Sequence, residues 1–157
     1  MKKIVLFLLM LTQLLCVSCA PRYTTEIPME DLCEAALLSL DPNTSFVQAE
    51  KGFLDGYFQT PDSVFEHRIY YATDGNNLDE FGIFYTTEPK RLEELLDNYL
   101  DDCLAENEAF YNSYIPEQTP KLRDAEVEVY GNCVAYAILS KQDEKAFFRV
   151  IEETLRV

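Results

Sequence analysis

The fold of this chain is decided by the stretch VFEHRIYYAT (residues 64–73), DGNN (residues 74–77) and DEFGIFYT (residues 79–86). Residues 64–73 are rich in β-branched and aromatic side chains, which favour a strand. Asp74-Gly75-Asn76-Asn77 are all favoured turn formers. Residues 79–86 then alternate Phe81, Ile83 and Tyr85 with Glu80, Gly82 and Phe84. The stretch therefore predicts a β-hairpin.

A second hairpin is predicted from residues 125–130 and 133–139, joined by the tight turn Gly131-Asn132. Three segments have apolar residues at helical spacing: residues 28–40, residues 89–114 and residues 140–155. Residues 89–114 carry the longest apolar stripe, with an acidic outer face. Residues 46–58 give a weaker helical signal, since Gly52 and Gly56 interrupt it.

The element order β-β-α-β-β-α, preceded by an N-terminal helix, predicts an α+β fold. Its most economical form is a two-layer domain with a four-stranded antiparallel sheet, built from the two hairpins, and helices on one face. The length of 157 residues fits one such domain, which we place at residues 28–157. Residues 19–27 are predicted to be a tether.

Residues 1–18 have the pattern of an export signal. Met1-Lys2-Lys3 is a short basic start, and the apolar run that follows is broken by Thr12 and Gln13. A membrane-spanning helix requires roughly 20 continuous apolar residues, so the segment predicts a signal peptide instead.

The end of this segment, LLCVSC (residues 14–19), resembles the lipobox of bacterial lipoproteins. The resemblance implies lipid attachment at Cys19 after cleavage behind Ser18. Cys16 stands where that motif usually has leucine. The expected location is the extracytoplasmic face of the cell membrane, held by the lipid on Cys19.

The chain is strongly acidic, with 13 basic and 28 acidic side chains and a net charge of −15. Loss of residues 1–18 removes Lys2 and Lys3 and no acid, which makes the charge −17. Nucleic acids and anionic membrane surfaces select for Lys and Arg, so we expect neither as a direct partner. A lipid is then the plausible means of holding the domain at the membrane.

Cys33, Cys103 and Cys133 remain after processing, with no C-x-x-C spacing to indicate a zinc or redox site. They lie in apolar patterns, which favours buried thiols, although one disulfide is also compatible with export. With one histidine in the chain, His67, a His-rich metal site is excluded. We expect no cofactor.

Three groups of side chains are candidate sites. Asp74, Asn76, Asp79 and Glu80 place oxygen ligands on a short loop that suits calcium, but the loop is shorter than an EF-hand and a plain turn is the favoured interpretation. Glu66-His67-Arg68 has the composition of a general-base cluster, yet a solvated strand face explains it better. The loop after the long helix offers a binding surface through Tyr111, Tyr114, Glu117 and Gln118, but packing of the helix end on the sheet is the favoured interpretation, because Tyr111 continues the apolar stripe.

Several segments carry a family resemblance: LDEFGIF (residues 78–84), the long acidic helix, FYNSYIPEQ (residues 110–118) and GNCV (residues 131–134). Together they resemble the bacterial lipoproteins grouped as domain of unknown function 4358, across residues 28–155. The resemblance implies a lipid-anchored extracytoplasmic domain. It implies no reaction, because the family has no assigned activity.

Two functions remain open on this evidence. A non-catalytic binding or interaction module is favoured by the size of the chain and by its lack of a recognisable catalytic motif. The alternative is a small cell-surface hydrolase, which requires a pocket with convergent titratable groups. Neither the ligand nor the protein partner follows from the sequence.

Overall fold

The computed structural model describes residues 21–157, so the predicted signal peptide and Cys19 lie outside the described residues. Within them the chain forms four helices and five strands. In chain order these are α2 (Met29–Leu38), β1 (Phe46–Gln48), β2 (Val64–Ala72), β3 (Glu80–Thr86), α3 (Pro89–Tyr114), α4 (Thr119–Arg123), β4 (Glu126–Tyr130), β5 (Cys133–Ile138) and α5 (Lys141–Leu155). The α+β class, both hairpins and the three long helices are confirmed.

The strands form a single antiparallel sheet in the order β1-β2-β3-β5-β4. The hairpin β2–β3 pairs Tyr71 with Glu80 next to its turn, and the hairpin β4–β5 pairs Tyr130 with Cys133. The two hairpins meet where β3 pairs with β5. Gly131 adopts a φ of +61° in the second turn, a conformation that glycine takes readily.

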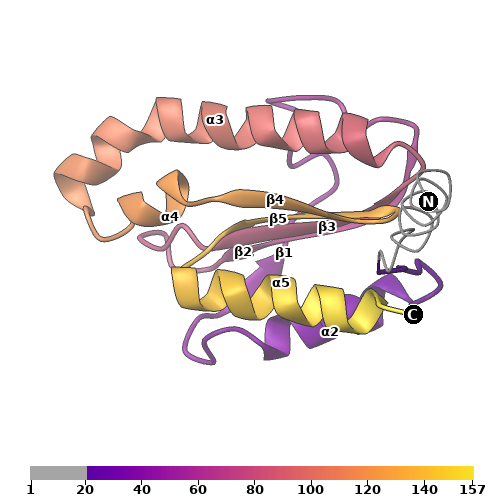
Figure 1. Cartoon of the computed structure of the whole chain (residues 1–157). Helices are drawn as coiled ribbons and strands as arrows, with labels where there is room; N and C mark the ends of the chain where they lie inside the picture. The colour runs from indigo at the N-terminus through magenta and orange to yellow at the C-terminus, as the bar shows by residue number, and fades with distance from the viewer. Residues whose placement is uncertain (1–20) are drawn as a thin grey trace, which may run out of the picture.

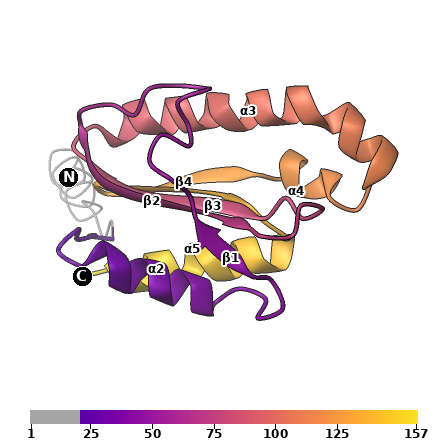
Figure 2. The ribbon, with the colours of Figure 1, turned by 180° about the vertical axis from the view of Figure 1, so that it is seen from behind.

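The predicted helices on one face are wrong, because helices cover both faces and the domain has three layers (Figures 1 and 2). One face carries α3, whose Leu92, Leu96 and Tyr99 pack on Phe84 and Tyr136. The other face carries α2 and α5, which pack against alternate residues of the same central strands. This second core includes Leu32, Phe81, Ile83, Ala135, Phe147 and Ile151.

The apolar pattern of the central strands explains the third layer. All six residues of β5 are buried, and so are six of the seven residues of β3. Strands that are apolar on both faces need a cover on each face, since one uncovered face would expose a continuous apolar surface. In the sequence, the weak alternation between apolar and polar residues in β3 and β5 was the signal that both faces of the sheet are covered.

The predicted four-stranded sheet is also wrong, because Phe46–Gln48 form a fifth strand where a weak helix was expected. Val47 pairs with Tyr71 on the edge of β2, and the Phe46 ring packs against Phe81 at 5.5 Å between centroids. Gly52, with a φ of +89°, then directs the chain into turns rather than a helix. Long-range pairing has overridden local propensity here.

Part of the predicted tether is folded onto the domain. Tyr23 bridges to Arg156, and the Thr24 N–H donates to the Leu155 carbonyl at 2.9 Å. The Tyr23 ring also packs edge-on against Tyr130. The ordered domain therefore begins close to Cys19, and both described ends of the chain lie together (Figure 1).

Candidate functional site

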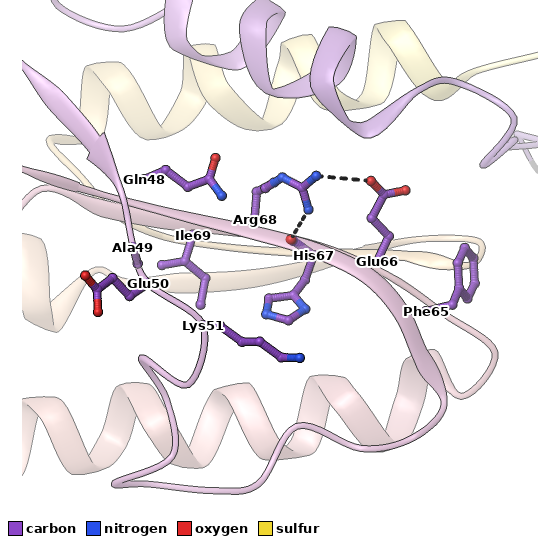
Figure 3. A pocket seen from close by; sticks show the side chains of 9 residues that line it. All are labelled: Gln48, Ala49, Glu50, Lys51, Phe65, Glu66, His67, Arg68 and Ile69. Carbon is purple, nitrogen blue, oxygen red and sulfur yellow. Dashed lines mark hydrogen bonds and ion pairs between the residues drawn. The ribbon is translucent and has the colours of Figure 1, made fainter.

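The most distinctive surface feature is a groove where β1 departs from β2. β1 pairs with residues 70–72 of β2, and the final backbone bond runs from the Ala49 N–H to the Ile69 carbonyl at 2.8 Å. Beyond it the chain turns away and leaves a cavity of about 310 Å³ beside the first half of β2. The cavity is lined by Gln48–Lys51 and Phe65–Ile69 (Figure 3).

The backbone of β2 alternates between its two neighbours. Ala72 donates its N–H to Asp79 on the β3 side, whereas Thr73 donates to Ser45 on the β1 side. In an antiparallel ladder this alternation continues every second residue. Arg68 and Tyr70 therefore face β3 with their main-chain groups, and His67 and Ile69 face the groove.

Arg68 covers part of this bare edge. Its Nη1 donates to the His67 carbonyl at 2.8 Å, and its Nη2 lies 3.4 Å from Glu66 Oε1 (Figure 3). Both side chains of this ion pair are over one-third exposed. The guanidinium thus occupies the position at which a neighbouring strand would present an N–H.

His67 lies on the α3 side of the groove and stacks on Phe84, with ring centroids 5.4 Å apart and an interplanar angle of 7°. Burial lowers its pKa, and the positive charges of Arg68 and Lys51 lower it further. The neutral imidazole is therefore favoured. Figure 3 places His67 and Lys51 on one side of the strand, with Arg68, Glu66 and Gln48 on the other.

A second, larger concavity continues the groove and shares Lys51, Phe65 and His67 with the first. It has a volume of about 820 Å³, and its far wall is the turn-rich segment between β1 and β2. Phe65 is 58% exposed where the two meet. We call the joined concavities along residues 64–69 the β2 groove.

The proposed calcium loop uses its carboxylates in other ways. Asp74 Oδ1 accepts a bond from the Asn76 N–H, which closes the turn favoured by the sequence. Asp79 is buried and accepts a 2.5 Å bond from Lys121 Nζ, which also donates to Asn77 Oδ1 at 2.8 Å. A lysine ammonium from α4 therefore sits where a calcium ion was considered.

The Glu80 side chain does not take part in that loop. It lies between the sheet and α3. Its Oε1 accepts bonds from the hydroxyls of Tyr99 at 2.7 Å and Tyr136 at 2.6 Å. Desolvation raises the pKa of Glu80, and the two hydroxyl bonds partly oppose this rise. Desolvation and the Glu80 charge raise the pKa of both tyrosines, which remain phenols.

Comparison with protein families settles the family of this chain. The model described as "Domain of unknown function (DUF4358)" matches residues 39–139, which make up well over half of the chain. The chain belongs to the DUF4358 family. No curated protein and no solved structure matches it. The family match covers β1 through β5, and so includes the whole β2 groove of this DUF4358 domain.

The aromatic loop of the DUF4358 domain divides into two parts. Tyr111 packs against the α3-side core, while Tyr114 is 74% exposed and its ring lies 4.8 Å from Phe110. Gln118 Oε1 accepts a bond from the Leu78 N–H, which fixes the loop to the first hairpin. Glu117 is exposed. Tyr114 and Glu117 are therefore the exposed members of the four, whereas Tyr111 and Gln118 contact the rest of the domain.

The three cysteines of the DUF4358 domain are free and buried. Desolvation raises the pKa of Cys33 to about 11 and of Cys133 to about 12, and it raises the pKa of Cys103. The thiolate is the reactive form of cysteine, so these positions disfavour nucleophilic chemistry. The prediction of buried thiols is confirmed.

Residues 21–157 contain neither a cluster of metal-ligating side chains nor a membrane-spanning helix. Over this part of the chain, no group of three or more His, Cys, Asp or Glu side chains is placed to hold a metal ion. Among the same residues, no helix is long and apolar enough to cross a membrane.

The sequence interpretation missed Lys121 and Tyr136. Thr119-Pro120 is a good start for a short helix, since proline suits the first turn, and it was the available signal for α4. Tyr136 was assigned to a strand without a partner for its hydroxyl. A buried tyrosine hydroxyl usually finds a hydrogen-bond partner, and that rule points to a nearby acceptor such as Glu80.

Proposed function

We propose that this DUF4358 domain is a non-catalytic interaction module of a lipid-anchored extracytoplasmic lipoprotein, and that it binds its partner in the β2 groove. The observation that carries this proposal is the bare half of β2, where main-chain groups of His67 face a cavity instead of a neighbouring strand. Exposed strand edges are ready-made pairing sites, and native proteins otherwise cover or block them.

The position of the groove within the fold supports a binding role. Helices cover both faces of the sheet, which leaves the edges as its accessible surfaces. The opposite edge strand, β4, carries side chains that bond one another and α5. Lys141 Nζ bonds both Glu126 and Glu144, and the Tyr130 hydroxyl bonds Glu128.

Several observations favour binding over the hydrolase alternative. The three cysteines are buried in the two cores, and burial raises the pKa of each thiol. His67 is stacked on Phe84, and both neighbouring charges that act on it are cationic, which opposes its protonation. A general base is usually oriented by a carboxylate or another acceptor, and cations around it make proton uptake harder.

The membrane anchor belongs to the same proposal. Cys19 precedes Tyr23 by four positions, so a lipid on Cys19 lies within about 14 Å of the first paired residue along an extended chain. Detergent-phase partitioning tests this step. The wild-type protein is expected in the detergent phase and Cys19→Ala in the aqueous phase. Equal partitioning of the two would refute lipidation at Cys19.

Site-specific photocrosslinking in the native envelope tests the binding role. A photoreactive phenylalanine analogue replaces Phe65 in the groove, and a matched control replaces Leu38, which is 79% exposed on α2. We expect a discrete crosslinked species from position 65 that is absent from position 38. No species from position 65, or the same species from both positions, would contradict the proposal.

A further inference from the structure

We propose that the β2 groove takes an extended polypeptide segment, which adds to residues 64–68 as a sixth, antiparallel strand and places an acidic side chain opposite His67. This inference rests on the proposed function, because it names the partner class of the same site. The added strand continues the line of β1 past the point where β1 turns away.

The main chain of β2 supplies the pairing groups. His67 directs its N–H and carbonyl into the groove, one pairing position beyond Ile69, whose carbonyl accepts the Ala49 N–H. Residues 64–69 span about 20 Å at the rise of a β-strand, enough for a partner of five or six residues. Strand addition of this kind takes its affinity from the main chain and its specificity from alternate side chains.

Arg68 is the removable cover of this edge. Its guanidinium already donates to the His67 carbonyl, as the N–H of an added strand would. The side chain is over one-third exposed and its 3.4 Å ion pair with Glu66 is long, so its displacement costs little. An incoming N–H replaces the guanidinium N–H with no loss of a bond at the carbonyl.

The charges around His67 select the side chain of the partner. In an antiparallel pair, directly opposed residues project to the same face of the sheet, so the residue opposite His67 enters the space beside His67 and Lys51. Lys51 is the cation on the same side of the strand as His67, whereas Arg68 lies on the other side and is paired with Glu66. A carboxylate fits this position, and it also supports a protonated imidazole.

The net charge of the chain also limits which partners can bind in the groove. A second copy of the chain is disfavoured, because two molecules of net charge −15 repel each other. A long acidic segment is disfavoured for the same reason. A short extended segment with one carboxylate, placed beside Lys51, satisfies both conditions.

Selection from a library of displayed linear heptapeptides tests the inference, with the full-length protein purified in detergent. We expect enriched peptides to share an acidic residue within a β-branched or aromatic sequence, and to compete with crosslinking from position 65. Lys51→Gln is expected to weaken their binding about fivefold, and the matched control Lys90→Gln, on the exposed start of α3, to leave binding unchanged.

Backbone methylation of a selected peptide then separates strand pairing from other binding modes. N-methylation at the residue opposite His67 removes one hydrogen bond and places a methyl group against the strand, so binding is expected to fall at least tenfold. N-methylation one residue away, where the N–H points outward, is the control, and we expect less than a threefold change.

The outcomes distinguish this inference from the proposed function. If selected peptides compete at position 65 but the two methylated peptides bind equally, strand addition is overturned and groove binding stands. If no selected peptide competes with crosslinking at position 65, strand addition is overturned. If position 65 also gives no crosslinked species in the envelope, the proposed function fails with it.

Discussion

The buried ion pair between Asp79 and Lys121 gives the sharpest stability prediction. Lys121→Met keeps most of the side-chain volume but removes the ammonium that contacts Asp79 Oδ1 and Asn77 Oδ1. The Asp79 side chain is 6% exposed and that of Lys121 is 14% exposed. The substitution therefore leaves a carboxylate in a poorly hydrated site.

The magnitude follows from what Asp79 retains. Removal of one partner of a buried ion pair costs about 3–5 kcal/mol when the other charge has no compensation. Here Asp79 Oδ2 keeps its 3.0 Å bond from Asn77, and the 14% exposure of Lys121 gives water some access. We therefore expect a loss of about 2–3 kcal/mol in the free energy of unfolding, or roughly 10 °C in Tm for a domain of this size.

Urea unfolding followed by far-UV circular dichroism measures this loss, with Lys145→Met on the exposed face of α5 as the control. The control makes the same change in net charge and is expected within about 0.5 kcal/mol of wild type. The double variant Asp79→Asn/Lys121→Met is expected to lose less than the two single variants together. A loss for Lys121→Met no larger than that of the control would refute the reasoning.

Three further predictions concern the cores and the last helix. Gly82→Ala places a Cβ into the Tyr136 ring and 2.9 Å from Phe84 Cε2, so we expect a loss of about 2 kcal/mol in chemical denaturation, and an unchanged midpoint would contradict this packing. Burial raises the pKa of Glu80 in the folded state, so the folded protein binds a proton at Glu80 more tightly than the unfolded chain does. The contribution of Glu80 to the free energy of unfolding therefore falls as the pH rises through the folded-state pKa. Glu80→Gln is therefore expected to be more stable than wild type at pH 7, with the difference shrinking towards pH 4, and a difference independent of pH would count against it. Ser140→Ala removes the acceptor for the Asp143 N–H at the start of α5, and its expected cost is about 1 kcal/mol by thermal melting, whereas no change in Tm would show that the cap is not stabilising.

The local elements of the fold were predictable because their signals are local. The Asp74–Asn77 and Gly131-Asn132 turns lie inside short sequence windows and fix both hairpins. Ser140 with Asp143 marks the start of α5, and the structure confirms the cap. Turn chemistry and capping act between residues a few positions apart, which a single sequence displays.

The third layer and the groove were not predictable in the same way. A sheet covered on one face leaves one of the two alternating sets of β3 exposed, but Gly82 and Phe84 are buried on the α3 side, as Phe81 and Ile83 are on the other. β1 is three residues long and forms through pairing with residues 70–72, so no local periodicity marks it. The groove exists because β1 stops early, and that length is set by long-range contacts.

The candidate ligands show the same limit. Oxygen-bearing side chains on the loop of residues 74–80 suggested calcium, but Lys121, 42 positions from Asp79, supplies the cation. Glu80 turned inward because Tyr99 and Tyr136 offer hydroxyl donors from α3 and β5. The sequence shows which residues of this loop are polar, but their hydrogen-bond partners come from distant parts of the chain.

The central claim is that the first half of β2 pairs with β3 on one edge only. Its other edge has no neighbouring strand and is free to accept one. Residue-resolved amide hydrogen exchange of the free protein tests it most directly. Arg68, which faces β3, and Tyr71, which pairs with Val47, are expected to exchange slowly, whereas the His67 amide exchanges rapidly and becomes protected when a selected peptide binds. A His67 amide as slow as that of Arg68 in the free protein would contradict the account.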